Sequence, residues 1–210
     1  MKIIPLELPD ALIIESDIYR DDRGYFTETF NFDKFQEAIG EFNIIQINQS
    51  KSKCGVIRAL HYQEPPFAQA KLVYVVKGEV LDVIVDIRKD SPTFGQHASV
   101  LLSGTNKTRV FVPKGFAHGF ITLTKDAIFN YCVNAPYAPQ YESGIKFDDK
   151  KLNIDWKKKR KIIVNERDRN LKSFDEIKLF TKEEFNVEYP QFYNKSLSHM
   201  KIKCRHENIE

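Results

Sequence analysis

The sequence has few cysteines and no regular spacing among them. Cys54, Cys132 and Cys204 are odd in number, lie far apart and form no C-x-x-C pair. A disulfide framework and a cysteine-based zinc site both need paired, closely spaced cysteines, so neither is expected. The three residues are predicted to be free thiols in a reducing compartment.

The sequence also lacks a long apolar run and a strong excess of one charge. Pro5, Glu7, Pro9 and Asp10 interrupt the N-terminal stretch MKIIPLELPDALIIES, so neither a secretory leader nor a membrane span is expected, and a cytoplasmic location is predicted. The 32 Lys and Arg against 29 Asp and Glu leave a net charge of +3. This balance indicates neither a nucleic-acid nor a membrane partner, so any anionic ligand must be bound by a local cluster of cations.

What the sequence does have is a block of short β-rich runs from about residue 43 to about residue 147, separated by turn residues. This pattern is typical of a sandwich or barrel. LVYVV and EVLDVIVDI flank Lys77-Gly78, which predicts a tight hairpin. Before the block, a helix is predicted with Asn31 as N-cap and Gly40 at its end, packed across the outside of the sheet.

The composition changes after about residue 150, where Lys, Asn, Glu and Asp become frequent. Thr181-Lys-Glu-Glu184 has the form of a capping box and predicts a short helix. We predict one domain over residues 1–177 and a C-terminal extension over residues 178–210, with disorder expected in part of the extension.

The stretch VIRALHYQEPPFAQAKLV, residues 56–73, places Arg58, His61 and Lys71 in an otherwise apolar, strand-like run. A free imidazole has a pKa of about 6.5 and can accept a proton near neutral pH. An ammonium group can stabilise the negative charge that develops on a carbonyl oxygen when the adjacent carbon is deprotonated, and a guanidinium can bind phosphate. Strict β alternation would place Arg58 and His61 on opposite faces, so this site requires a bend or a bulge.

A second histidine lies in VPKGFAHGF, where Pro113, Gly115 and His118 form the P-x-G-x-x-H signature of the second cupin motif. It predicts a mainly β fold of the cupin type, a double-stranded β-helix (jelly roll) with a few short helices. Metal-binding cupins carry two further histidines in the first motif, but the corresponding place here is His61-Tyr62-Gln63. With one imidazole there, no metal is expected.

Several motifs together resemble the dTDP-4-dehydrorhamnose 3,5-epimerase family over roughly residues 1–177. They are, in order, DDRGYFTETF, QINQS, VIRALHYQ, QAKLV, VKGEVLDVIVDIRKDSPTFG, VFVPKGFAHGF, NYCVNAPYAPQYESGI and NERD. The resemblance implies an isomerase that acts without a cofactor on a nucleotide-linked 4-keto-6-deoxy sugar, on the path to dTDP-L-rhamnose and cell-surface polysaccharide such as lipopolysaccharide. The ketone acidifies the hydrogens at C-3 and C-5, a base removes one, and an acid reprotonates the enolate on the opposite face.

The resemblance also implies roles for individual residues. His61 matches the family's base, and Asp168 matches the carboxylate that orients it. Tyr131 matches the proton donor, Lys71 lies near the keto oxygen, and His118 lies beside the same ligand. Without the motif, Tyr131 would be interpreted as a half-buried strand aromatic.

For the nucleotide end, the resemblance implies a set of binding positions. They are Arg23, Glu28, Gln46, Asn48, Arg58, Tyr137, Glu142 and Arg167. Tyr137 would stack on the base, and family members are homodimers in which an N-terminal strand joins the neighbouring sheet. Without the resemblance, Arg23 and Glu28 would be interpreted as ordinary exposed ion-pair residues.

Three departures from the family pattern stand out. Ala59 occupies a position that is commonly Gly, and its methyl group is expected to narrow the pocket or shift the strand. Arg167 replaces a common Lys, which keeps the charge and changes the hydrogen-bond geometry. The tail after about residue 177 is longer than in typical members.

Alternative functions stay open from the sequence. A relative that inverts only C-3 or only C-5, or that uses a GDP- or CDP-linked sugar, would carry the same His and Tyr. A non-catalytic cupin that binds a sugar nucleotide would bind without proton exchange. A cupin oxygenase would require a bound metal, for which ligands are missing.

Overall fold

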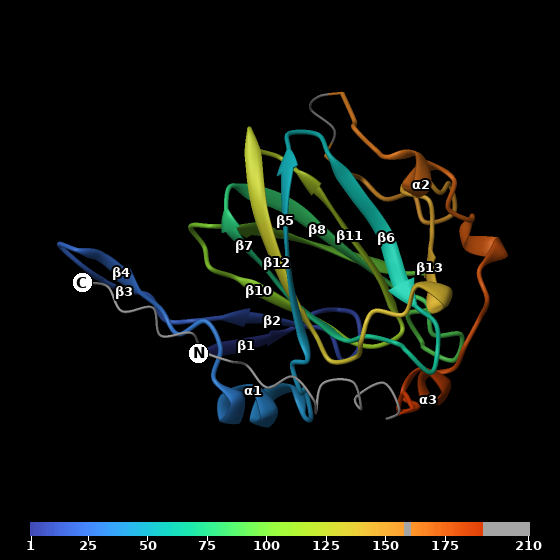
Figure 1. Cartoon of the computed structure of the whole chain (residues 1–210), viewed down its shortest axis with the longest axis horizontal. Helices are drawn as coiled ribbons and strands as arrows, with labels where there is room; N and C mark the ends of the chain where they lie inside the picture. The colour runs from blue at the N-terminus through green and yellow to red at the C-terminus, as the bar shows by residue number, and fades with distance from the viewer. Residues whose placement is uncertain (158–160, 191–210) are drawn as a thin grey trace, which may run out of the picture.

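The computed structural model describes residues 1–157 and 161–190 and consists mainly of antiparallel strands in two sheets that face each other (Figure 1). One sheet has six strands, in the order β1 (Lys2–Pro5), β2 (Leu12–Glu15), β10 (Arg109–Val112), β7 (Lys71–Lys77), β12 (Asp126–Val133) and β5 (Gln46–Lys53). The other has five strands, in the order β13 (Glu142–Gly144), β6 (Ile57–Gln63), β11 (Phe116–Thr122), β8 (Glu79–Asp86) and β9 (His97–Ser103). The predicted jelly roll is confirmed.

The core between the two sheets follows from alternation along the strands. On β8, Val80 and Ile84 point between the sheets, whereas Leu81, Val83 and Val85 point to the outer face. Apolar side chains on both faces mean that both faces must be covered. A sheet with only one buried face would show polar residues at alternate positions.

The prediction of a hairpin at Lys77-Gly78 is wrong. Strand β7 pairs with β10 and β12 in the six-stranded sheet, whereas β8 pairs with β11 and β9 in the other. The chain therefore turns a corner between sheets at Gly78, which has φ +79°. A Cβ there would lie 2.2 Å from the carbonyl oxygen of Asp126, so the close approach of two backbones requires glycine.

The predicted helix before the β block is confirmed as α1 (Phe32–Ile39). The Asn31 side chain accepts a hydrogen bond from the N–H of Lys34, and Gly40 follows the last residue. Phe35 is buried among side chains from the outer face of the six-stranded sheet, including Leu72 and Phe111. The helix covers that face, as predicted.

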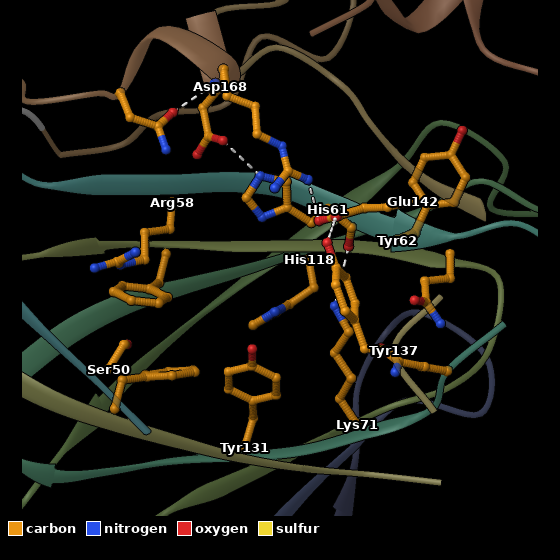
Figure 2. A pocket seen from close by; sticks show the side chains of 16 residues that line it. Ser50, Arg58, His61, Tyr62, Lys71, His118, Tyr131, Tyr137, Glu142 and Asp168 are labelled. Atoms are coloured by element: carbon orange, nitrogen blue, oxygen red, sulfur yellow. Dashed lines mark hydrogen bonds and ion pairs between the residues drawn. The ribbon is translucent and has the colours of Figure 1, made fainter. Parts of the chain in front are cut away.

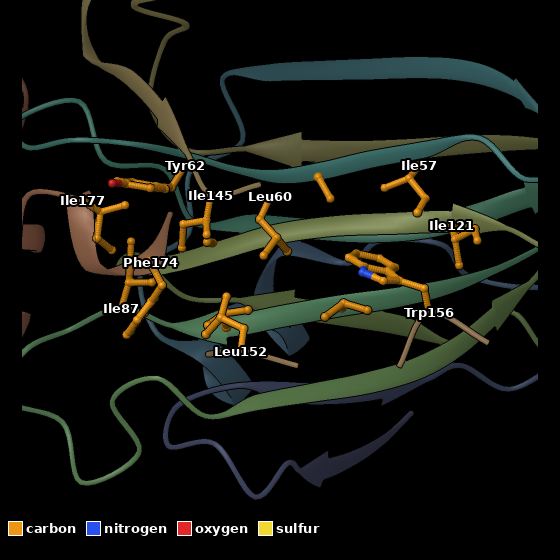
Figure 3. Close-up of a cluster of buried hydrophobic side chains, with 14 of the residues drawn as sticks. Ile57, Leu60, Tyr62, Ile87, Ile121, Ile145, Leu152, Trp156, Phe174 and Ile177 are labelled. Atoms are coloured by element: carbon orange, nitrogen blue, oxygen red, sulfur yellow. The ribbon is translucent and has the colours of Figure 1, made fainter. Parts of the chain in front are cut away.

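The outer face of the five-stranded sheet is covered by the chain after β13. This covering segment, residues 145–157 and 161–187, includes α2 (Glu166–Arg169), η2 (Phe174–Glu176) and α3 (Lys182–Phe185). The short helix η1 (Pro139–Tyr141) precedes β13. It contributes Ile145, Leu152, Trp156, Phe174 and Ile177 to a cluster with Ile57 and Leu60 of β6 (Figure 3). The sheet therefore has an apolar layer on its outer side.

The described part of the extension packs on the barrel. The capping box at Thr181 and Glu184 is confirmed and begins α3, and Phe185 is buried in the outer cluster. Lys182 forms an ion pair with Asp10 at 2.7 Å. The boundary at residue 177 stays a prediction. The disorder expected in part of residues 178–210 also stays a prediction, and residues 191–210 lie outside the described part of the chain.

Two smaller features complete the fold. A short hairpin of β3 (Tyr19–Asp21) and β4 (Gly24–Phe26) projects from the barrel with Tyr19, Tyr25 and Phe26 exposed (Figure 1). Cys54 and Cys132 are free thiols, as predicted, and Cys204 lies outside the described residues. Within residues 1–157 and 161–190, no helix is long and apolar enough to cross a membrane.

Candidate active site

A pocket of about 240 Å³ lies between the two sheets at the end where β6, β7, β11 and β12 meet the covering segment (Figure 2). It brings together the predicted residues His61, Tyr131, Asp168, Lys71, Arg58, His118, Tyr137, Glu142 and Arg167. These residues come from both sheets, from the loop before β13 and from α2. The barrel therefore assembles groups that are more than 100 positions apart in the sequence.

A bulge in β6 places Arg58 and His61 on the same face. Against β11, His118 pairs with His61 and Phe120 pairs with Arg58. The two paired positions are three residues apart on β6 but only two residues apart on β11, so β6 contains one extra residue between them. The extra residue reverses the alternation between the two positions. The bulge that the sequence required for this site is present.

His61 and Asp168 form an imidazole–carboxylate pair. His61 Nε2 lies 2.9 Å from Asp168 Oδ1, and the Asp168 side chain is 3% exposed. Burial alone would raise the pKa of Asp168, but the hydrogen bond and charge interaction with His61 outweigh it, and the pKa is lowered. An ionised carboxylate that accepts the Nε2 proton leaves Nδ1 of His61 as the nitrogen that can accept another proton.

The α2 helix holds Asp168 in place. Asn165 caps the helix by accepting a hydrogen bond of 2.7 Å from the N–H of Asp168, and the N–H of Ala59 lies 3.4 Å from Asp168 Oδ2. Asn165 also lines the pocket. It was not predicted, although an Asn three residues before Asp168 is the spacing of an N-cap and could have indicated it.

Tyr131 and Lys71 enter the pocket from the six-stranded sheet. Figure 2 shows the Tyr131 hydroxyl pointing from β12 toward His61 and His118 on the opposite sheet. Burial, followed by the charge of Glu142, raises the pKa of Tyr131, which keeps the phenol protonated and able to donate. Lys71 Nζ donates to the carbonyl oxygen of His61 at 3.2 Å, and burial lowers the pKa of Lys71 to about 8.

Glu142 joins a cation and a phenol at the pocket. Its carboxylate forms an ion pair with Arg167 and accepts a hydrogen bond of 2.5 Å from the Tyr137 hydroxyl. That hydrogen bond raises the pKa of Tyr137, and the hydrogen bond to Glu142 raises the pKa of Arg167. Tyr137 is 47% exposed, so its ring is available to a flat ligand at the pocket entrance.

Four predicted residues do not line the pocket of their own chain. Arg23 lies in the β3–β4 hairpin and pairs with Asp21 at 2.6 Å, and Glu28 pairs with Lys34 at 2.8 Å. Gln46 and Asn48 lie on β5 and hydrogen-bond to each other at 2.8 Å. Their predicted contacts with a nucleotide stay predictions.

Sequence reasoning missed several pocket residues, namely Ser50, Tyr62, Gln63, Gln69, Phe120 and Phe129. Gln63 has the clearest task. Its amide donates to the carbonyl oxygen of Pro136 at 3.0 Å and accepts from the N–H of Ala138 at 2.7 Å, so it holds the chain on both sides of Tyr137. No local pattern indicates a pairing across more than 70 positions.

Of the two effects expected of Ala59, a narrowing of the pocket is not found, and a shift of the strand stays a prediction. Ala59 is fully buried in the outer cluster and does not line the pocket. It lies beside Gly119 on β11, where a Cβ would come within 2.4 Å of the Ala59 methyl group. The methyl group is accommodated because its neighbour has no side chain.

Among the described residues, no three His, Cys, Asp or Glu side chains gather closely enough to hold a metal ion. A base and an orienting carboxylate lie on one side of the pocket, and a phenol and an ammonium lie on the other. This arrangement can remove a proton from carbon beside a ketone and return one from the opposite face.

Comparison with known proteins yields one consistent match. A family model for dTDP-4-dehydrorhamnose 3,5-epimerase matches residues 5–176. A protein of that name from Shigella flexneri is 50% identical over 157 residues, which are 74% of this chain and 87% of the relative. One from Methanothermobacter thermautotrophicus is 46% identical over 178 residues, which are 83% of this chain and 95% of the relative.

Solved structures agree in fold and in sequence. The dTDP-6-deoxy-D-glucose-3,5-epimerase of Legionella pneumophila, in complex with dTDP-4-keto-L-rhamnose, is 41% identical with a TM-score of 0.82 and covers 90% of this chain and 98% of its own. A 3'-monoepimerase from Streptomyces bikiniensis, in complex with dTDP-quinovose, is 32% identical with a TM-score of 0.78 and covers 91% and 96%.

Proposed function

Because the chain belongs to the dTDP-4-dehydrorhamnose 3,5-epimerase family, we propose that it inverts C-3 and C-5 of dTDP-4-dehydro-6-deoxy-D-glucose to give dTDP-4-dehydro-L-rhamnose. The product-like ligand in the Legionella pneumophila structure supports this substrate class. The proposed enzyme is an isomerase that needs no cofactor.

One observation carries the proposal, which is that the His61–Asp168 pair faces Tyr131 across a single pocket. We assign His61 as the base that removes the proton at C-3 or C-5, with Asp168 stabilising the imidazolium that forms. Lys71 stabilises the enolate oxygen at C-4, and Tyr131 donates a proton to carbon from the opposite side. His118 lies between these groups and contacts the sugar.

The nucleotide occupies the pocket entrance in this proposal. Tyr137 stacks on the base, Arg58 binds the diphosphate, and Glu142 and Arg167 contact the ligand from the covering segment. The N–H at Nε of Arg58 donates to the Ser52 hydroxyl at 3.0 Å, which leaves the terminal nitrogens of the guanidinium for phosphate.

Some of the remaining predicted contacts, those of the N-terminal segment, come from a second copy of the chain. Arg23, Glu28, Gln46 and Asn48 lie outside their own pocket, and the β3–β4 hairpin carries exposed aromatic rings. We propose a homodimer in which the N-terminal segment is exchanged and Arg23 reaches the partner subunit's pocket. We place this dimer in the cytoplasm, in keeping with the free thiols Cys54 and Cys132.

A second candidate is inversion at one centre only. The Streptomyces bikiniensis relative at 32% identity is named a 3'-monoepimerase, so this fold is found with that activity as well. The number of centres that exchange hydrogen distinguishes the two candidates.

Proton NMR of dTDP-4-dehydro-6-deoxy-D-glucose incubated with the protein in deuterium oxide tests the proposal. Loss of the signals at both C-3 and C-5 is expected. Loss of one signal would establish a single-centre epimerase. No exchange, repeated with GDP- and CDP-linked analogues, would overturn the enzymatic assignment and favour a protein that only binds the sugar nucleotide.

A further inference from the structure

A second imidazole–carboxylate pair lies beside the first, and its histidine lines the same pocket. His61 and His118 are directly paired residues on β6 and β11. His61 Nε2 lies 2.9 Å from Asp168, and His118 Nε2 lies 2.8 Å from Asp82 Oδ2 on β8. The proposed function uses Asp168 but gives Asp82 no task.

Asp82 is buried on the inner face of the barrel. Its side chain is 1% exposed, and Phe120 is its neighbour across the β8–β11 ladder. A carboxylate taken out of water destabilises the fold unless a hydrogen bond and an opposite charge compensate for the lost hydration. His118 supplies the hydrogen bond. The opposite charge must come from a cation in the same region.

Lys71 lines the same pocket as His118, the hydrogen-bond partner of Asp82, and the negative charge of Asp82 raises the pKa of Lys71. It is buried, its Nζ donates to a backbone carbonyl, and among the described residues it forms no ion pair. The groups around it are His61 on β6, Asp82 on β8 and His118 on β11.

Two further groups face Lys71, Tyr131 on β12 and Glu142 on β13. Tyr131 is held as a neutral phenol, and Glu142 is already bound to Arg167 and Tyr137. Within the described part of the chain, Asp82 forms no ion pair with a Lys or Arg side chain, so Lys71 is the cation that its charge can act on.

We propose that Asp82 is a positioning residue with two roles. Its negative charge keeps Lys71 in the ammonium form. Its carboxylate accepts the hydrogen bond from Nε2–H of His118, which leaves Nδ1 of His118 to accept a hydrogen bond from a sugar hydroxyl. The inference rests on the proposed function, in which Lys71 must be charged to stabilise an enolate. Asp82 itself does not line the pocket and would act on the reaction through Lys71 and His118.

The sign of the effect follows from the two opposing influences on Lys71. Burial lowers the pKa of Lys71 to about 8, while the charges of Glu142 and Asp82 act in the opposite direction and raise it. Removing the charge of Asp82 lowers this pKa further. The ammonium is then lost at a lower pH, and the alkaline decline of activity moves toward neutral pH.

Asp82→Asn tests the proposal because it keeps the shape and removes the charge. Deuterium exchange at C-3 and C-5 is measured for the variant and the wild type at pH 6.5 and at pH 8.5. The ratio of variant to wild-type rate is expected to fall roughly fivefold between the two pH values, because a tenfold change in proton binding corresponds to one pKa unit.

Asp86→Asn is the matched control on the same strand. Asp86 is fully buried and pairs with Arg88 at 2.7 Å, outside the pocket. Its variant is expected to melt at a lower temperature than the wild type and to show the same rate ratio at both pH values. A general loss of stability is thereby separated from an effect on Lys71.

The possible outcomes distinguish a failure of the inference about Asp82 from a failure of the proposed function. A folded Asp82→Asn variant with a constant rate ratio overturns the inference and leaves the proposed function standing. If that variant does not fold, Asp82→Ser, which is also neutral but smaller, is measured against the same criterion. Absence of exchange in the wild type itself removes the proposed function, and the inference with it.

Discussion

The two faces of the five-stranded sheet differ sharply, although the same strands build both. On β6, Arg58 and His61 point to the pocket, whereas Ile57, Ala59 and Leu60 pack in the outer cluster (Figure 3). The inner face at this end carries titratable groups, whereas the outer side chains of β6 pack in an apolar cluster. One strand can serve both because a bulge changes its alternation at the point where chemistry is needed.

The two faces are nevertheless connected through the covering segment. Residues 145–157 and 161–187 place Trp156 and Phe174 on the outer face and, between them, deliver Asp168 to the pocket. Burial of the apolar layer therefore fixes the position of a carboxylate that a loop in water would not hold. Substitutions on each face should affect either chemistry or stability, and the following variants test that separation.

His61→Ala should have the largest effect on the inner face. General base catalysis typically contributes 10²- to 10⁴-fold, so exchange at both carbons should fall by about 10³-fold or more. Nucleotide binding, measured by calorimetry with dTDP, should be retained because the proposed function places His61 at the sugar end of the ligand.

His97→Ala is the control for that variant, since His97 lies on β9 away from the pocket. Its exchange rate should equal that of the wild type. Wild-type exchange in His61→Ala would remove His61 from the mechanism.

Trp156→Ala should have the largest effect on the outer face. The ring is 1% exposed, and its N–H donates to the carbonyl oxygen of Phe147 at 2.7 Å. Truncating a buried Trp costs about 3–5 kcal/mol in the free energy of unfolding, which chemical denaturation would measure. At low temperature, where the variant is folded, exchange per molecule should stay close to wild type, and a loss as large as that of His61→Ala would contradict the separation of the faces.

The sequence predicted local structure better than it predicted which strands pair. Local patterns predicted the strands, α1 with its Asn31 cap and the capping box at Thr181, because caps and alternation are local physics. They failed at Gly78, since a short turn between two strands does not reveal whether the strands pair or enter different sheets.

Pairings over long distances were the harder part of the site. The contact between His61 and Asp168 spans 107 positions and came from resemblance to a family, not from spacing. The Asp82–His118 and Gln63–Ala138 hydrogen bonds were missed because a buried Asp or Gln has no local signature of its partner.

Tyr131→Phe should have an intermediate effect and should distinguish two steps on the inner face. In the proposed mechanism the phenol only returns a proton to carbon, so inversion should fall about 10- to 100-fold while the first proton removal falls less. Comparing product formation with deuterium uptake in the same sample measures the difference. Equal losses of both would mean that Tyr131 acts mainly through packing beside Phe129.

Ala59→Gly should have the smallest effect and tests whether the outer face is separate from the pocket at the point where they are closest. The variant removes a buried methyl group and adds backbone freedom, which together should lower the free energy of unfolding by about 1–2 kcal/mol. Exchange at C-3 and C-5 should stay within about twofold of wild type, because the methyl group faces Gly119 and not the ligand. A change in which carbons exchange would show instead that this position reaches the substrate through the strand, since the N–H of Ala59 lies 3.4 Å from Asp168.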